Sequence, residues 1–112
     1  MTADDIAVLA PAMGGDADEI IAEVEQGLAT LLRYPDGSRI VVRLEESETV
    51  APELVIVAGA GGDAPGKVRE LCRLADEKGW TARFHTRRPA LGRLLSGLGF
   101  VESERVYRYG RK

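Results

Sequence analysis

The stretch Glu53-Leu-Val-Ile-Val-Ala-Gly-Ala-Gly-Gly-Asp-Ala-Pro-Gly66 decides the fold of this chain. Residues 53–58 form a continuous apolar run that is too short for a helix, which predicts a central strand covered on both faces. Residues 59–66 are rich in glycine and predict a tight turn. The turn leads into an amphipathic helix expected over Pro65–Lys78, and Gly79 ends it. The apolar side chains of that helix recur at helical spacing: Val68, Leu71, Cys72 and Ala75.

Downstream, the pattern continues as strand, helix and strand. Residues 80–85 alternate between apolar and polar side chains, which predicts a strand with one buried face. A short helix is expected to start at Pro89, with Gly97 and Gly99 at its end. Residues 100–109 are interpreted as one last strand, and residues 110–112 as a tail.

Upstream, two β-rich runs over residues 28–34 and 38–45 flank Pro35-Asp36-Gly37, which predicts a β-hairpin. Before the hairpin, Thr2 and Asp5 have the spacing of a capping box for a helix near Ala3–Ala12. A second helix follows Asp16 or Asp18 and is expected to end at Gly27. The prediction is one α/β (α+β) domain over residues 1–112: a helical part over 1–27, then a mixed sheet of about five strands with two later packing helices over 28–109.

Composition excludes several classes of protein. With 112 residues, 45% of them hydrophobic, the chain can bury one hydrophobic core without the help of disulfides or a structural metal. Its longest apolar stretch, residues 54–60, is far short of the roughly 20 residues that span a bilayer. The acidic start of the chain differs from a secretion signal. The single cysteine, Cys72, excludes an internal disulfide and a cysteine zinc cluster and is interpreted as a packed thiol. We therefore expect a soluble, cytoplasmic protein without a metal site.

Charge is distributed unevenly along the chain. Residues 1–56 carry a net charge of −9, and residues 57–112 carry +6. The favoured interpretation is that the two halves face each other in one sheet. Acidic and basic side chains would then lie within a screening length of each other. Nucleic-acid binding is not favoured, because acidic residues alternate with the bases and aromatic residues are scattered. The alternative is a basic docking surface for an acidic protein patch or for a second copy, and its candidate residues are Arg83, Arg87, Arg88 and Arg93.

The second half of the chain resembles the GNAT superfamily of N-acetyltransferases. The residues that carry this resemblance are the strand 54–58 with its glycine-rich turn, the helix ending Leu74-Ala-Asp-Glu-Lys-Gly-Trp80, and the segment Arg88-Pro-Ala-Leu-Gly-Arg-Leu-Leu-Ser-Gly-Leu-Gly-Phe100. The resemblance covers about residues 28–109. It implies a reduced form of that family's fold, and it extends to short GNAT-like proteins of tailed bacteriophages.

The resemblance also implies a place for acetyl-CoA. In that family, backbone N–H groups between a strand and a helix N-terminus hold the CoA pyrophosphate, which suits the positive end of a helix. The candidate cradle here is Gly59, Gly61, Gly62 and Gly66. That family's motif reads Arg or Gln, then two residues, Gly, one residue, and Gly or Ala. No register of this motif fits well here: with Ala60 at the Arg or Gln position, the first glycine falls on Asp63. Pro65 removes one N–H donor. We expect Asp63 to cap the helix with its own carboxylate instead.

No catalytic residue is predicted. Many members of that family place a tyrosine acid five residues before the phenylalanine of Leu98-Gly99-Phe100, and Leu95 occupies that position here. Glutamates that could act as a base lie near strand ends: Glu45, Glu46 and Glu53. The only histidine, His85, has no paired nucleophile and is interpreted as an ordinary strand residue.

Three hypotheses about function follow. The first is a non-catalytic GNAT-like interaction or structural module that binds a protein partner or itself, such as a phage virion or assembly component, located in the virion if phage-encoded. The second is a minimal acyl-CoA-dependent N-acetyltransferase that uses the glycine-rich turn for acetyl-CoA. The third is a small regulatory or toxin–antitoxin-type binder on the same fold.

Overall fold

The computed structural model describes residues 1–112 except 47, 49, 86–99, 104–105 and 110–112. Its first part is helical: α1 (Ala3–Met13), a 3₁₀ turn η1 (Gly14–Asp16) and α2 (Ala17–Glu25). The remaining elements are β1 (Thr30–Arg33), β2 (Arg39–Glu45), β3 (Glu53–Ala60), α3 (Ala64–Glu77), β4 (Thr81–His85), β5 (Phe100–Ser103) and β6 (Val106–Tyr109).

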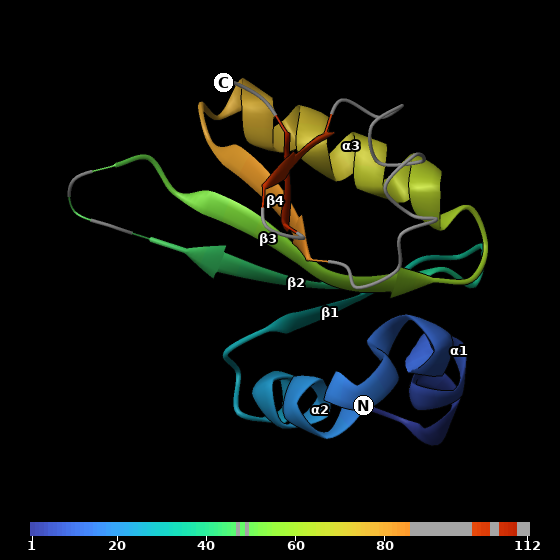
Figure 1. Cartoon of the computed structure of the whole chain (residues 1–112). Helices are drawn as coiled ribbons and strands as arrows, with labels where there is room; N and C mark the ends of the chain where they lie inside the picture. The colour runs from blue at the N-terminus through green and yellow to red at the C-terminus, as the bar shows by residue number, and fades with distance from the viewer. Residues whose placement is uncertain (47, 49, 86–99, 104–105, 110–112) are drawn as a thin grey trace.

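The strands form one mixed sheet in the order β1-β2-β3-β4-β6-β5. Among the described strands, β3 and β4 are the one parallel pair, matched from Glu53↔Thr81 to Ile56↔Phe84, and α3 is the crossover between them. Figure 1 shows α1 and α2 on one face of the sheet and α3 on the other. This confirms the predicted mixed α/β class.

Two hydrophobic clusters hold these layers together. On the α3 side, Ile40 and Ile56 of the sheet pack against Val68 and Cys72 of the helix. On the other side, Leu9 and Met13 of α1 belong to a cluster with Ile20, Ala29, Val41 and Ala58. Side chains alternate between faces along β2, so neighbouring residues Ile40 and Val41 enter different clusters. Both faces of the central strands are thus covered, as their apolar runs predict.

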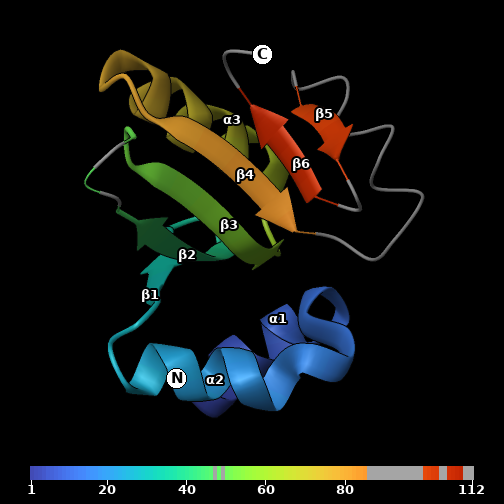
Figure 2. The same cartoon turned by 60° about the vertical axis from the view of Figure 1, so that its left-hand side comes forward.

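The prediction of one last strand over residues 100–109 was wrong. The chain forms two strands there, β5 and β6, paired antiparallel from Phe100↔Tyr109 to Ser103↔Val106. Figure 2 shows β6 lying between β4 and β5. The described strands therefore form a sheet of six strands rather than about five. The polar run Glu102-Ser-Glu-Arg105 interrupts the apolar pattern where the strand divides. The helix expected from Pro89 lies outside the described residues.

Local signals placed the other elements to within a few residues. Thr2 and Asp5 form the expected capping box of α1, each accepting a backbone N–H of the other. The hairpin of β1 and β2 turns at Pro35-Asp36-Gly37, with Tyr34 N–H donating to the Ser38 carbonyl over 3.0 Å. Asp16 precedes α2 without a capping hydrogen bond from its side chain.

Candidate functional site: the glycine-rich turn and the start of α3

The glycine-rich turn joins β3 to α3 and lies against the β1–β2 turn. Gly61 and Gly62 have positive φ angles of 77° and 43°, which only glycine adopts easily. A Cβ at Gly61 would lie 2.9 Å from the Gly37 carbonyl oxygen and 2.9 Å from a methyl of Val8. A Cβ at Gly62 would lie 2.7 Å from the carboxylate of Asp36. Close packing of the two turns therefore explains both glycines without a ligand.

Asp63 caps α3 with its own side chain. Its Oδ1 accepts the N–H of Gly66 over 3.1 Å, as the sequence predicts. A Cβ at Gly66 would collide with this capping carboxylate, so Gly66 leaves room for the cap. Pro65 stands in the first turn of the helix and offers no N–H.

Asp36, from the turn between β1 and β2, is the second carboxylate at this helix start. Its Oδ2 accepts the backbone N–H of Asp63 over 2.9 Å and the Nζ of Lys67 over 3.0 Å. Its Oδ1 accepts the hydroxyl of Ser38 over 2.6 Å and the N–H of Ser38 over 3.0 Å. The Ser38 hydroxyl, followed by the Asp63 and Ser38 N–H groups and Lys67, holds the pKa of Asp36 well below its usual range.

The backbone donors at the start of α3 are consequently in use. Asp63 N–H donates to Asp36, and Ala64 N–H donates to the Gly61 carbonyl over 3.1 Å. Gly66 N–H donates to the Asp63 side chain, and Lys67 N–H donates to the Asp63 carbonyl over 3.1 Å. Every N–H from residue 63 to residue 67 thus has an acceptor within the protein. Two carboxylates supply the negative charge that a helix N-terminus attracts.

Lys67 and Tyr34 complete this corner. The Lys67 ammonium lies 5.5 Å from the centre of the Tyr34 ring, a cation–π contact between α3 and the residue that follows β1. Its hydrogen bond to Asp36 raises the pKa of Lys67, whereas burial raises the pKa of the Tyr34 hydroxyl. The lysine charge is therefore matched by Asp36 rather than left for an external phosphate.

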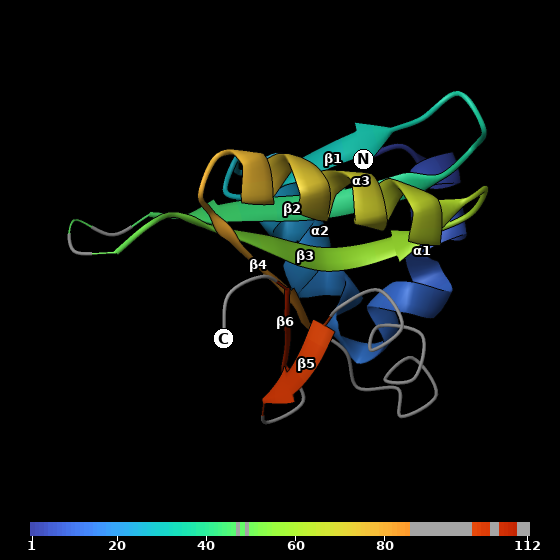
Figure 3. The ribbon, with the colours of Figure 1, turned by 90° about the horizontal axis from the view of Figure 1, so that it is seen from above.

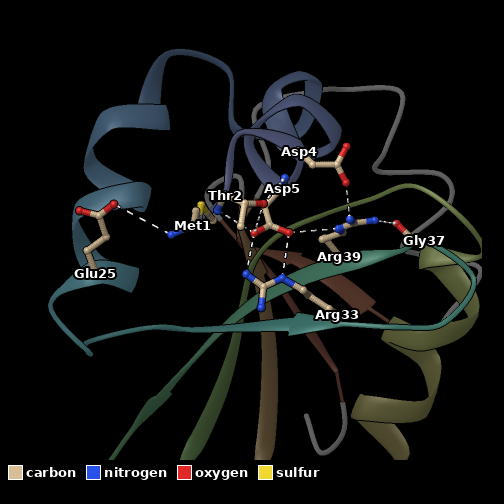
Figure 4. A network of polar contacts seen from close by, with 8 residues as sticks. All are labelled: Met1, Thr2, Asp4, Asp5, Glu25, Arg33, Gly37 and Arg39. Carbon is tan, nitrogen blue, oxygen red and sulfur yellow. Dashed lines mark hydrogen bonds and ion pairs between the residues drawn. The ribbon is translucent and has the colours of Figure 1, made fainter.

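A second polar network fastens α1 to the same hairpin (Figure 4). The buried carboxylate of Asp5 accepts Nε of Arg33 over 2.9 Å, and its other oxygen accepts an Nη of Arg33 over 2.7 Å. Arg39 contacts Asp5 over 3.3 Å and Asp4 over 2.7 Å, and it donates to the Gly37 carbonyl of the turn. The Arg33 guanidinium is the main cause of a lowered pKa at Asp5. The network holds the β1–β2 turn in place from the α1 side.

Arg83, the one predicted docking arginine within the described residues, is engaged inside the protein. Its Nη lies 2.9 Å from Glu45, and its Nε lies 3.3 Å from Glu53. Arg43 extends this set of charges from Glu45 to Glu23 of α2. Arg83, a base of the second half, is thus paired with two acids of the first half across β2, β3 and β4, in line with the favoured charge interpretation. The other three candidates, Arg87, Arg88 and Arg93, lie outside the described residues, as do Leu95 and Leu98-Gly99.

Among the described residues, the remaining candidates form no second candidate site. Cys72 is buried in the core, and burial raises the pKa of its thiol to about 12. His85 ends β4, and its side chain lies outside the described residues. In the part of the chain that the structure describes, no three His, Cys, Asp or Glu side chains are grouped as a metal site would require. Among the same residues, no helix combines the length and apolar character needed to cross a membrane.

Sequence reasoning missed Asp36 and Asp5 as members of these networks. Asp36 was recognised only as the middle of a Pro-Asp-Gly turn, and Asp5 only as half of a capping box. Their distant partners, Asp63 and Arg33, are 27 and 28 residues away in sequence. The sequence does contain a carboxylate in the hairpin turn and a glycine-rich segment at the start of a helix. These two features indicate a contact only when the topology that brings them together is known.

Comparisons with known proteins give limited additional information. No known family's sequence profile matches the chain. A segment of the pikromycin polyketide synthase component PikAII of Streptomyces venezuelae is 39% identical to it over 74 residues, which is 62% of this chain and 2% of that protein's length. The crystal structure of the NatC complex bound to Gag peptide and CoA contains a chain that matches with a TM-score of 0.45 and 15% identity, covering 82% of this chain and 76% of that one. This structural similarity is too low to support an argument about function.

Proposed function

We propose that this chain is a non-catalytic interaction module built on a GNAT-like fold. One observation carries the proposal: the start of α3, where the resemblance implies a pyrophosphate cradle, is filled by the carboxylates of Asp36 and Asp63. A pyrophosphate placed there would meet two negative charges and would have to replace hydrogen bonds that the protein already makes. Coulomb repulsion and lost hydrogen bonds both oppose binding.

The catalytic side supports the same proposal. Glu45 and Glu53, which could have served as a general base, are both in ion pairs with Arg83. The position of the family's tyrosine acid is Leu95, which cannot donate a proton. Binding, rather than chemistry, is therefore the function that these residues suit best.

The partner is proposed to be a protein. Arg83, Arg87, Arg88 and Arg93 remain the predicted docking residues for an acidic surface, and a virion or assembly role remains the prediction if the chain is phage-encoded. An acidic partner would have to compete with Glu45 and Glu53 for Arg83. The paired reversal Arg87→Glu/Arg88→Glu tests the docking surface, because it should abolish capture of an acidic partner without touching the ion pairs of Arg83.

Calorimetric titration with acetyl-CoA, and with CoA alone, tests the absence of cofactor binding. We expect no heat of binding up to millimolar ligand, where affinity would correspond to only about −4 kcal/mol. Micromolar binding would overturn the proposal and favour the N-acetyltransferase alternative. In that case Asp63→Gly should bind acetyl-CoA more tightly, because it removes a carboxylate from the cradle, whereas Gly15→Ala, far from the turn in sequence, should bind like the wild type.

A further inference from the structure

Among the strands that the structure describes, β1 lies at the edge of the sheet and has a neighbour only on the β2 side (Figure 3). Tyr34 N–H points toward β2, since it donates to the Ser38 carbonyl. Backbone N–H and C=O groups alternate in direction along an antiparallel strand, so those of Leu31 and Arg33 point away from β2. Ala29 follows the same alternation, and its outward N–H donates to the Glu23 carbonyl over 3.2 Å. Within the described residues, no partner accepts from or donates to the outward groups of Leu31 and Arg33.

Strand β1 carries neither a proline nor a bulge, two of the features that prevent pairing at an edge. Proteins protect edge strands with proline, bulges or charged side chains, and β1 reads Thr-Leu-Leu-Arg. Its single charge, on Arg33, is turned toward Asp5 over 2.7 and 2.9 Å. That charge is therefore matched within the protein and offers little repulsion to an approaching strand.

We propose that β1 pairs antiparallel with β1 of a second copy about a two-fold axis between the two Leu32 residues. In this register Leu31 stands opposite Arg33 of the second copy and Arg33 opposite its Leu31. The outward groups on both strands then make four main-chain hydrogen bonds. The contact is isologous and joins two six-stranded sheets into one.

The neighbouring registers are poorer for physical reasons. Centring the pair on Arg33 would set two guanidinium groups directly opposite each other, which is destabilising. Centring it on Leu31 would bring Arg33 opposite Ala29, whose N–H already donates to Glu23. Only the register centred on Leu32 uses all the outward groups of Leu31 and Arg33.

Side chains favour the same register. Leu32 packs, half-buried, on the α3 side of the sheet, so the two copies of Leu32 would meet on an apolar face. Thr30 would face Tyr34 of the second copy.

Sedimentation equilibrium of the full chain tests association, and a cysteine variant tests the register. We expect a dimer at micromolar concentration. Residues facing each other at a non-hydrogen-bonded position have Cα atoms about 4.5 Å apart, which is compatible with a disulfide. Leu32→Cys should therefore form a disulfide-linked dimer on mild oxidation, whereas Thr30→Cys should not. A monomer throughout, or preferential cross-linking through Thr30→Cys, would overturn the proposal.

Leu31→Pro tests the main-chain hydrogen bonds directly, because it removes an N–H that points away from β2 and leaves the ladder to β2 intact. Losing two of the four bonds in the dimer should weaken association roughly tenfold or more. Amide hydrogen exchange of the wild type covers the case in which this variant does not fold. The Leu31 and Arg33 amides should gain protection with protein concentration, whereas those of Thr30 and Leu32 should be protected at all concentrations. Exchange at Leu31 and Arg33 that is independent of concentration would contradict the pairing.

Discussion

The carboxylate of Asp36 accepts the backbone N–H of Asp63 over 2.9 Å and so ties the β1–β2 turn to the first turn of α3. The attraction has the same origin as phosphate binding at a helix N-terminus: backbone donors and the positive end of the helix favour negative charge. Here the anion is part of the chain itself. The glycines of the turn then serve close packing between two segments of one protein.

Replacing Asp36 tests how much this contact stabilises the fold. Asp36→Ala should lower the melting temperature by several degrees, because Ser38, Asp63 and Lys67 lose a common acceptor. Asp36→Asn keeps an oxygen acceptor but loses the negative charge, so its melting temperature should lie between those of wild type and Asp36→Ala. Thermal unfolding by circular dichroism ranks the three proteins. Equal melting temperatures would show that the contact contributes nothing to stability.

The turn glycines offer a second test with two matched controls. Gly62→Ala should lower the free energy of unfolding by about 2 kcal/mol or more, since it combines a positive φ with a Cβ against Asp36. Gly27 also has a positive φ, but a Cβ there meets nothing within 4 Å. Gly27→Ala should therefore cost only about 1 kcal/mol of backbone strain.

Gly15→Ala isolates the effect of substitution itself. Gly15 has neither a positive φ nor a neighbour within 4 Å of a Cβ, so its replacement should change stability by less than about 0.5 kcal/mol. Urea unfolding of all three variants gives the comparison. If Gly62→Ala were no worse than Gly27→Ala, the close approach of Asp36 to Gly62 would be wrong.

Short-range signals explain what could be predicted from the sequence. Thr2 and Asp5 are three residues apart, and Asp63 caps a helix that begins at the next residue, so each interaction is determined locally. The alternating pattern after Trp80 likewise predicts β4 without knowledge of its neighbours. Such features depend on backbone geometry over a few residues.

Long-range relationships could not be predicted for the opposite reason. The contacts of Asp36 with Asp63, and of Asp5 with Arg33, depend on how β1, β3 and the helices are stacked. The sequence alone offers many other acid–base pairs that could equally be in contact. The division of residues 100–109 into β5 and β6 was missed because apolar residues at both ends suggested one strand. The polar run over residues 102–105 was the local signal for two strands, whereas the position of β6 between β4 and β5 is a long-range feature.

Cys72 should be chemically inert in the folded protein. Its side chain is 1% exposed, and burial raises the pKa of the thiol to about 12, so the reactive thiolate is scarce at neutral pH. A thiol reagent should label the native chain slowly and the urea-unfolded chain at once, with release of chromophore as the readout. Rapid labelling of the native protein would mean that α3 opens readily or that Cys72 is not packed in the core.

Asp5 should make stability depend on pH. Its folded-state pKa lies well below the ordinary value of 3.8, chiefly because Arg33 donates to it, so the unfolded chain binds a proton there first as pH falls. The stabilisation is complete above about pH 4 and is lost as pH decreases further. Asp5→Asn removes the charge and should lower the free energy of unfolding at neutral pH by about 2 kcal/mol. Asp36 also has a lowered pKa, so the wild type and Asp5→Asn share that contribution, and their difference isolates Asp5. Urea unfolding from about pH 7 down to about pH 2 should show this difference shrinking toward acid pH. A difference that stays constant across the range would assign the loss in Asp5→Asn to packing rather than to the charge.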